Sequence, residues 1–174
     1  MDKGKEPGGA WLEKLTGAHS PPASDIFWAA LGAFAGMASL SYLDQHLVRR
    51  GLTRLTIGPT AAIAVILTAS PKAPVAAKWN IFVAHMGAAI ASIAALALFG
   101  PGWLARAVGV AASVAFMQFT GSLHPPAAGL ALLFVDSATH QSLGWRYVVF
   151  PGLAAALVLV LVTEAVSLLR RSFS

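Results

Sequence analysis

Long uncharged apolar runs dominate this sequence and decide the solvent in which it folds. Ile26–Leu43 is a run of 18 residues without a charge, Ile81–Phe99 is a second such run, and Val148–Leu169 is a third that holds only Glu164. A bilayer core of about 30 Å requires roughly 20 apolar residues per helix, so these runs predict transmembrane helices. The chain is 57% hydrophobic and 11% charged, with a mean hydropathy of +0.70, which is more apolar than a soluble domain of this length.

The remaining apolar runs complete the expected architecture. We predict an all-α membrane protein, a bundle of about six helical segments, with four long helices near residues 26–43, 81–99, 104–119 and 148–169. Two shorter helices are expected to start at Pro59 and Pro125. The transmembrane domain then covers 26–171. Residues 1–25 are polar and lack the basic-then-apolar order of a signal peptide, so they are interpreted as a polar tail with room for a short helix around Trp11–Leu15.

Charge and composition exclude several classes of function. The formal net charge of +5 comes from residues in the tail and the connections, where lysine and arginine meet lipid headgroups, so no nucleic-acid partner is expected. The chain contains no cysteine, which excludes disulfides, thiolate catalysis and cysteine-ligated metals. Because the sequence also contains no nucleophile–base spacing, phosphate loop or carboxylate pair, we expect neither an enzyme nor a cofactor or metal.

The apolar runs follow the order long, short, long, and then repeat it. The short run begins with Gly58-Pro59-Thr60 in the first half and with His124-Pro125-Pro126 in the second, and Pro59 and Pro126 are 67 residues apart. Interrupted segments at matching positions of two halves are typical of transporters whose site lies near the bilayer midplane. If the short segments cross the membrane the repeat is inverted, and if they re-enter it is parallel; the charge distribution leaves this open.

Proline suits the first turn of a helix, so each motif is interpreted as the N-terminus of a half-helix. The first N–H groups of a helix have no intrahelical partner and carry about half a positive charge. Two such ends facing one another predict an anion site. The alternative is that both prolines merely start ordinary helices at the membrane surface.

The residues around the second motif resemble the HPP family of small membrane proteins, named for the tripeptide found here as His124-Pro125-Pro126. Further similarities are the Gly58-Pro59-Thr60-Ala61 run, Ser70-Pro71, and Trp79-Asn80 followed by His85. The resemblance covers Ile26 to Arg171. It implies a membrane protein and, as in plant and cyanobacterial members, nitrite transport, while many bacterial members lack an assigned substrate. Lys78 stands where the family usually has proline, and Ala84 where it usually has glycine.

Five positions carry the candidate substrate site together with Pro125 and Pro126. His124, beside the helix break, and His85, within an apolar helix, could contact an anion or titrate near neutral pH. Thr60 and Pro59 lie at the first half-helix. Asn80 is interpreted either as a cap of the following helix or as a substrate contact.

Four other polar residues have structural alternatives. Thr56 could offer a hydroxyl, and Gln118 could line a pore or bridge helices. Glu164 is expected to pair with Arg170 or Arg171 unless it carries protons. Lys78 is expected to extend to the headgroups, with anion attraction as the alternative.

These observations predict a channel or transporter for a small inorganic anion, with nitrite implied by the resemblance. A non-transporting membrane scaffold or sensor subunit is the alternative. The two proline motifs, His85 and His124 are expected to converge at mid-membrane, where neutral imidazoles would donate hydrogen bonds to the anion. Short half-helices need protein around their ends, so a homo-oligomer is expected. The bacterial inner membrane is the expected location.

Overall fold

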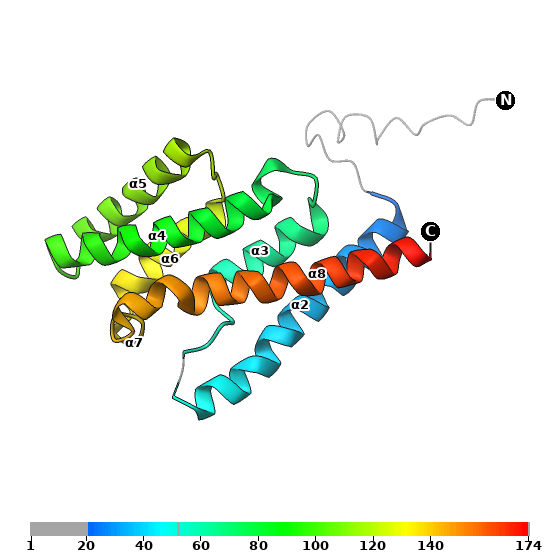
Figure 1. The fold of residues 1–174 in the computed structure, drawn as a ribbon, viewed down its shortest axis with the longest axis horizontal. Helices are drawn as coiled ribbons and strands as arrows, with labels where there is room; N and C mark the ends of the chain where they lie inside the picture. Colours follow the sequence, from blue (N-terminus) through cyan, green and yellow to red (C-terminus); the bar gives the residue numbers. More distant parts are fainter. Residues whose placement is uncertain (1–20, 52, 174) are drawn as a thin grey trace, which may run out of the picture.

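The computed structural model describes residues 21–51 and 53–173, and within them the regular elements are all helices joined by short connections (Figure 1). The tail helix considered around Trp11–Leu15 lies outside these residues. The elements, in chain order, are α2 (Ala23–Arg49), α3 (Gly58–Ala69), the 3₁₀ turn η1 (Pro74–Ala76), α4 (Lys78–Phe99), α5 (Trp103–Thr120), α6 (Pro125–Asp136), α7 (Ala138–Gln141), the 3₁₀ helix η2 (Gly144–Val148), the π-helical turn η3 (Val149–Leu153) and α8 (Ala154–Ser172).

Four helical segments are long and apolar enough to cross a membrane. They are Ala23–Arg49, Lys78–Phe99, Trp103–Thr120 and Gly144–Ser172. The helices α3 and α6 have 12 residues each and, at 1.5 Å per residue, reach only about 18 Å, well short of the apolar core. The chain is therefore an all-α membrane protein with four long and two short segments, as the sequence predicts.

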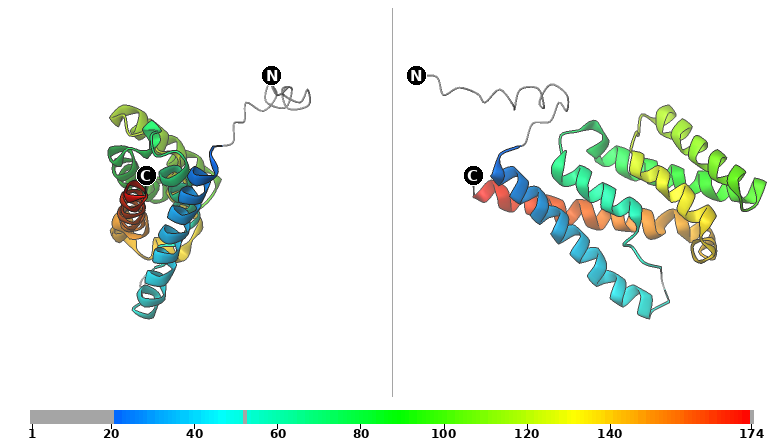
Figure 2. Two further views of the ribbon diagram at one scale, coloured as in Figure 1. Left: turned by 90° about the vertical axis from the view of Figure 1, so that its right-hand side faces the viewer. Right: turned by 180° about the vertical axis from the view of Figure 1, so that it is seen from behind.

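The helices pack as two groups of three, and each group combines helices from both halves of the sequence. The α2 unit consists of α2, α3 and α8, and the α4 unit consists of α4, α5 and α6. Figures 1 and 2 show α3 and α6 starting near the middle of the molecule and running toward opposite ends. The two units meet where α3 contacts α6 and where η2 and η3 contact α4.

Small residues let α2 approach the other helices of its unit. A Cβ atom on Gly32 would lie 2.9 Å from Cγ2 of Thr68 on α3, and one on Gly36 would lie 2.8 Å from Cδ2 of Leu159 on α8. This close approach is what the small-xxx-small spacing of the two glycines favours. Buried aliphatic residues that include Leu40, Ile63 and Leu159 fill the space between the three helices.

The segment after α2 differs from its predicted form. The predicted long helix ends near residue 43, but α2 continues to Arg49 and Asp44 is only 8% exposed. The Asp44 carboxylate accepts hydrogen bonds from the backbone N–H groups of Leu55 (2.5 Å) and Thr56 (3.1 Å). It thereby fixes the chain that leads into α3, because a buried carboxylate is stable only when it is hydrogen-bonded.

The last span begins differently from the predicted helix at Val148. Residues 144–153 form η2 and η3, Phe150 has a non-helical conformation (φ −116°, ψ 132°), and the regular helix begins at Ala154. Tyr147 is fully buried and donates its hydroxyl to the Leu130 carbonyl at 2.7 Å. Since a buried tyrosine hydroxyl needs a partner, this bond fixes η2 against α6.

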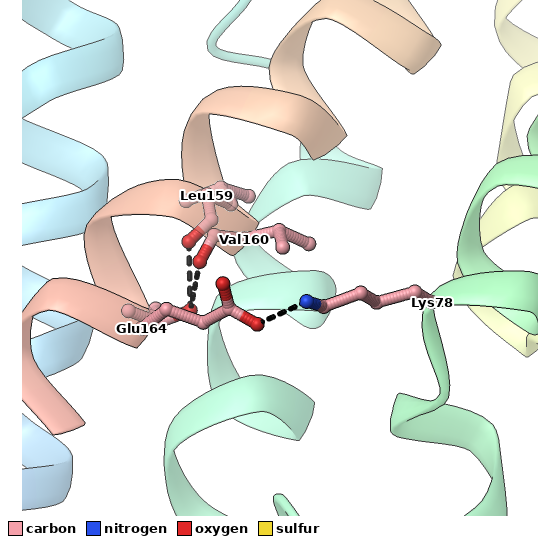
Figure 3. Close-up of polar contacts among 5 residues, drawn as sticks. Lys78, Leu159, Val160 and Glu164 are labelled. Carbon is pink, nitrogen blue, oxygen red and sulfur yellow. Dashed lines mark hydrogen bonds and ion pairs between the residues drawn. The ribbon is translucent and has the colours of Figure 1, made fainter. Parts of the chain in front are cut away.

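Ion pairs link elements that are distant in the sequence. Glu164 pairs with Lys78 at 2.5 Å, not with Arg170 or Arg171, so the expected pairing of Glu164 was wrong (Figure 3). Arg170 pairs with Asp25, which joins the end of α8 to the start of α2. The side chains of Lys78 and Glu164 are 63% and 49% exposed at the surface of the bundle.

Candidate functional site

The N-termini of the two half-helices lie together. Gly58 and Pro59 of α3 and Pro125 and Pro126 of α6 line one surface groove with a volume of about 500 Å³. A Cβ atom on Gly129, one turn into α6, would lie 2.9 Å from Cγ of Pro59. The glycine therefore allows the start of α3 to rest directly on α6.

The prolines reduce the number of free donors at these ends. Proline has no N–H group, and the first N–H groups after the prolines are engaged: Thr60 donates to the Ile57 carbonyl and Ala127 to the His124 carbonyl, both at 3.0 Å. An anion in this groove would be attracted mainly by the helix dipoles and less by unpaired N–H groups, and the Asp136 carboxylate that lines the same groove is paired with Arg106. This corrects the expectation that orphan donors would make the site.

The Thr60 hydroxyl caps its own helix. It donates to the Ile57 carbonyl at 2.6 Å and accepts the Ile57 N–H at 3.1 Å, and the side chain is fully buried. The hydroxyl of Thr60 is therefore used by the backbone of its own helix.

The two candidate histidines face each other behind the second proline motif. His85, on the second turn of α4, and His124, the N-cap of α6, are 1% and 0% exposed, and their ring centroids are 5.3 Å apart. His85 Nδ1 lies 2.7 Å from the Ile81 carbonyl, and His124 Nδ1 lies 2.7 Å from the Val75 carbonyl. The Nε2 atom of each ring is buried without a hydrogen-bond partner.

These bonds fix the tautomer of both rings. A carbonyl oxygen can only accept, so each Nδ1 must carry the proton. A neutral ring then has an unprotonated Nε2, which is an acceptor. The prediction that neutral imidazoles donate hydrogen bonds to an anion was therefore wrong, because the only N–H donor of each neutral ring is bonded to a backbone carbonyl.

Side chains at the start of α4 hold the loop that carries the second motif. Asn80 Nδ2 donates to the Leu123 carbonyl at 3.2 Å and to the Pro74 carbonyl at 3.0 Å. The Trp79 indole N–H reaches the Thr120 carbonyl at 3.3 Å. Asn80 is thus not a helix cap, since α4 begins at Lys78 after the N-cap Ala77. It positions His124 by joining two loops.

The loop carbonyls and neighbouring backbone at this site were not predicted from the sequence. Val75 contributes only its carbonyl, which no side-chain pattern reveals. Gly152 of η3 lies against His85, since a Cβ there would be 3.2 Å from Cδ2 of that ring. The Trp79-Asn80 motif was noticed, but its spacing alone does not indicate that it contacts residues 120–123.

Two further candidates lie away from the histidine pair. Gln118 is exposed on the outer side of α5. Thr56 donates its backbone N–H to Asp44, and its hydroxyl is buried without a partner.

These features define a helical membrane protein with several spans. It has long apolar helices, two half-helices whose N-termini meet, and a buried pair of imidazoles. A family model described as "HPP, transmembrane region" matches residues 18–173. The chain belongs to the HPP transmembrane family, as its motifs indicate.

Two curated relatives come from Dictyostelium discoideum, and both are described as transmembrane proteins. One is 31% identical over 151 residues, which cover 84% of this chain and 53% of the relative. The other is 31% identical over 159 residues, covering 87% and 51%. The chain therefore spans about half the length of the curated relatives it matches. No solved structure matches it significantly.

Proposed function

We propose that the protein transports a small inorganic anion across the membrane, with nitrite as the substrate suggested by the family resemblance. The observation that carries the proposal is that the N-termini of α3 and α6 line one groove. Two helix dipoles then direct their positive ends to the same place inside a layer where a bare anion is otherwise very costly. The proposed location is a bacterial inner membrane, and the proposed activity is transport without catalysis.

The arrangement of the helices supports an inverted repeat around this groove. The half-helices α3 and α6 run in opposite directions, and so do the long helices that follow them, α4 and α8 (Figure 1). In transporters, such repeats allow one binding site to open alternately to the two faces of the membrane. We infer that the α2 unit and the α4 unit are the two parts that move.

A homo-oligomer completes the proposal. The groove is open at the surface of the single chain, where the exposed Gly58 and Pro125 would otherwise meet lipid. Backbone ends within the apolar layer require protein around them, so a second copy is the proposed cover. Light scattering after size-exclusion chromatography in mild detergent measures the mass, and a monomer would contradict this part of the proposal.

The test of transport is anion uptake into liposomes that contain the purified protein, with nitrite, nitrate and formate compared. We expect protein-dependent uptake of at least nitrite. Absence of uptake of all three anions would favour the scaffold or sensor alternative, which the burial of His85 and His124 in this conformation supports.

A matched pair of variants tests the groove itself. Gly58 has open space around it, so both Gly58→Asp and Gly58→Asn fit. The two side chains have the same shape, and an acidic residue stabilises a helix N-terminus, so loss of folding is not expected. Gly58→Asp should lower anion uptake several-fold relative to Gly58→Asn because it places a negative charge beside the anion. Equal uptake by the two variants would remove the groove from the pathway.

A further inference from the structure

The His85–His124 pair carries two buried hydrogen-bond acceptors. Both Nδ1 atoms bond backbone carbonyls, so both Nε2 atoms carry lone pairs in the neutral rings. Both Nε2 atoms are buried and have no partner. A buried polar atom without a partner is destabilising, so such a pair in an apolar bundle points to a ligand that satisfies it.

The chemistry of two lone pairs specifies that ligand. A bare anion such as nitrite offers only acceptors, so it would be repelled by both Nε2 atoms. Protonating both rings would bury two adjacent cations, which is strongly unfavourable. A single proton between the pair and the anion satisfies one ring and neutralises the anion. The bound species consists of one proton and one anion, whether the proton is bonded to Nε2 or to the anion.

The ion-paired side chains of α4, α5, α6 and α8 and the Tyr147 hydroxyl do not supply this proton, since they are engaged elsewhere. Lys78 of α4 pairs with Glu164 of α8, and Arg106 of α5 pairs with Asp136 of α6, each at 2.5 Å. Tyr147 of η2 donates its hydroxyl to a carbonyl. We therefore take water at the membrane face from which the anion enters as the source of the proton.

We propose that the His85–His124 pair binds the proton of a weak acid, so that the protein carries a monovalent anion together with one proton. This inference rests on the proposed anion transport and specifies its substrate as the conjugate base of a weak acid. On loading, an N–H bond forms at one Nε2 or the acid O–H donates to it. On release to the other face, the same proton leaves with the anion, and the rings return to their starting state.

The experiment uses liposomes that contain the full-length protein and a pH-sensitive dye in the lumen. Nitrite is added outside, and uptake and internal acidification are followed together under a potential set by potassium and valinomycin. Protein-free liposomes give the leak of the neutral acid, which is subtracted. We expect about one proton to enter per nitrite, with a rate independent of the imposed potential.

The variants are His85→Asn and His124→Asn. The asparagine amide occupies the position of Nδ1, so it keeps the hydrogen bond to the carbonyl of Ile81 or Val75 while removing Nε2. We expect each to lower coupled uptake about tenfold, the effect of losing one strong buried hydrogen bond. Size-exclusion profile and thermal midpoint establish that the variants are folded; if the asparagine variants fail to fold, nitrogen-15 NMR of the histidines in the unmodified protein replaces them.

The possible outcomes separate the two proposals. Nitrite uptake that follows the membrane potential without acidification overturns proton binding and leaves anion transport standing. Absence of uptake overturns both. Coupled uptake that is unchanged in both folded asparagine variants overturns the role of the histidine pair. In the NMR experiment, Nε2-protonated rings in the resting protein would overturn it, whereas Nδ1-protonated rings whose Nε2 resonances shift with added nitrite at low pH would support it.

Discussion

Gly129→Ala tests the contact that holds the two half-helices together. The added Cβ would lie 2.9 Å from Cγ of Pro59, an atom in a ring that cannot turn away. Overpacking of this kind destabilises the folded state by about 1–3 kcal/mol, while replacing glycine by alanine within a helix stabilises it by about 0.5–1 kcal/mol. We expect a net loss of about 1–2 kcal/mol, or a fall of about 2–8 °C in the thermal midpoint of a chain of this size.

Gly58→Ala is the matched control, since it lines the same groove and has no atom within 4 Å of its added Cβ. Its thermal midpoint should be unchanged or raised. Intrinsic fluorescence of the five tryptophans in mild detergent follows unfolding of both variants. If Gly129→Ala melts at or above the temperature of Gly58→Ala, the close contact between α3 and α6 is not a constraint and the argument from it fails.

Three further predictions concern single side chains. Tyr147→Phe should cost about 1 kcal/mol because it removes the hydroxyl bonded to the Leu130 carbonyl, measured as a lower thermal midpoint. A double-mutant cycle of Lys78→Ala and Glu164→Ala should give a coupling below about 1 kcal/mol, since both side chains are exposed; a larger value would mean that the pair is shielded from water. Burial lowers the pKa of His140, in the connecting helix α7, below that of the unfolded chain, about 6.5, so the unfolded state binds more protons and stability falls as the pH drops below that value. His140→Gln should therefore lose less stability between pH 7.5 and pH 5 than the unmodified protein, and an equal loss would contradict the shift.

The helical elements were predictable because the bilayer imposes a local rule. A span needs about 20 apolar residues and proline favours the first turn of a helix, so α5 and the starts of α3 and α6 could be read directly from the sequence. The break at residues 121–124 followed from the same reasoning. The predicted limits of α2 and of the last span were less accurate, because Asp44 is held by backbone N–H groups of a later segment and Phe150, before Pro151, departs from helical geometry.

The site was predictable in its residue types but not in its bonds. Histidines in an apolar background stand out, and the structure brings His85 and His124 together. Which ring nitrogen is free depends on carbonyls of residues 75 and 81, and backbone carbonyls have no sequence signature. The pairing of Lys78 with Glu164 likewise depends on how α4 crosses α8. Apolar periodicity carries no information about such contacts.

In the α2 unit, helices from the start of the chain pack against the last helix, and this has a consequence for synthesis. The half-helix α3 ends at Ala69, but its partner α8 begins only at Ala154. At about 5–20 residues per second, α2 and α3 wait roughly 4–17 s in the membrane before the ribosome delivers that helix. During this interval one flank of a helix too short to span the bilayer faces lipid or the insertion machinery. Completion of the last segment, and not insertion of the first, is therefore the step at which this protein becomes a closed bundle.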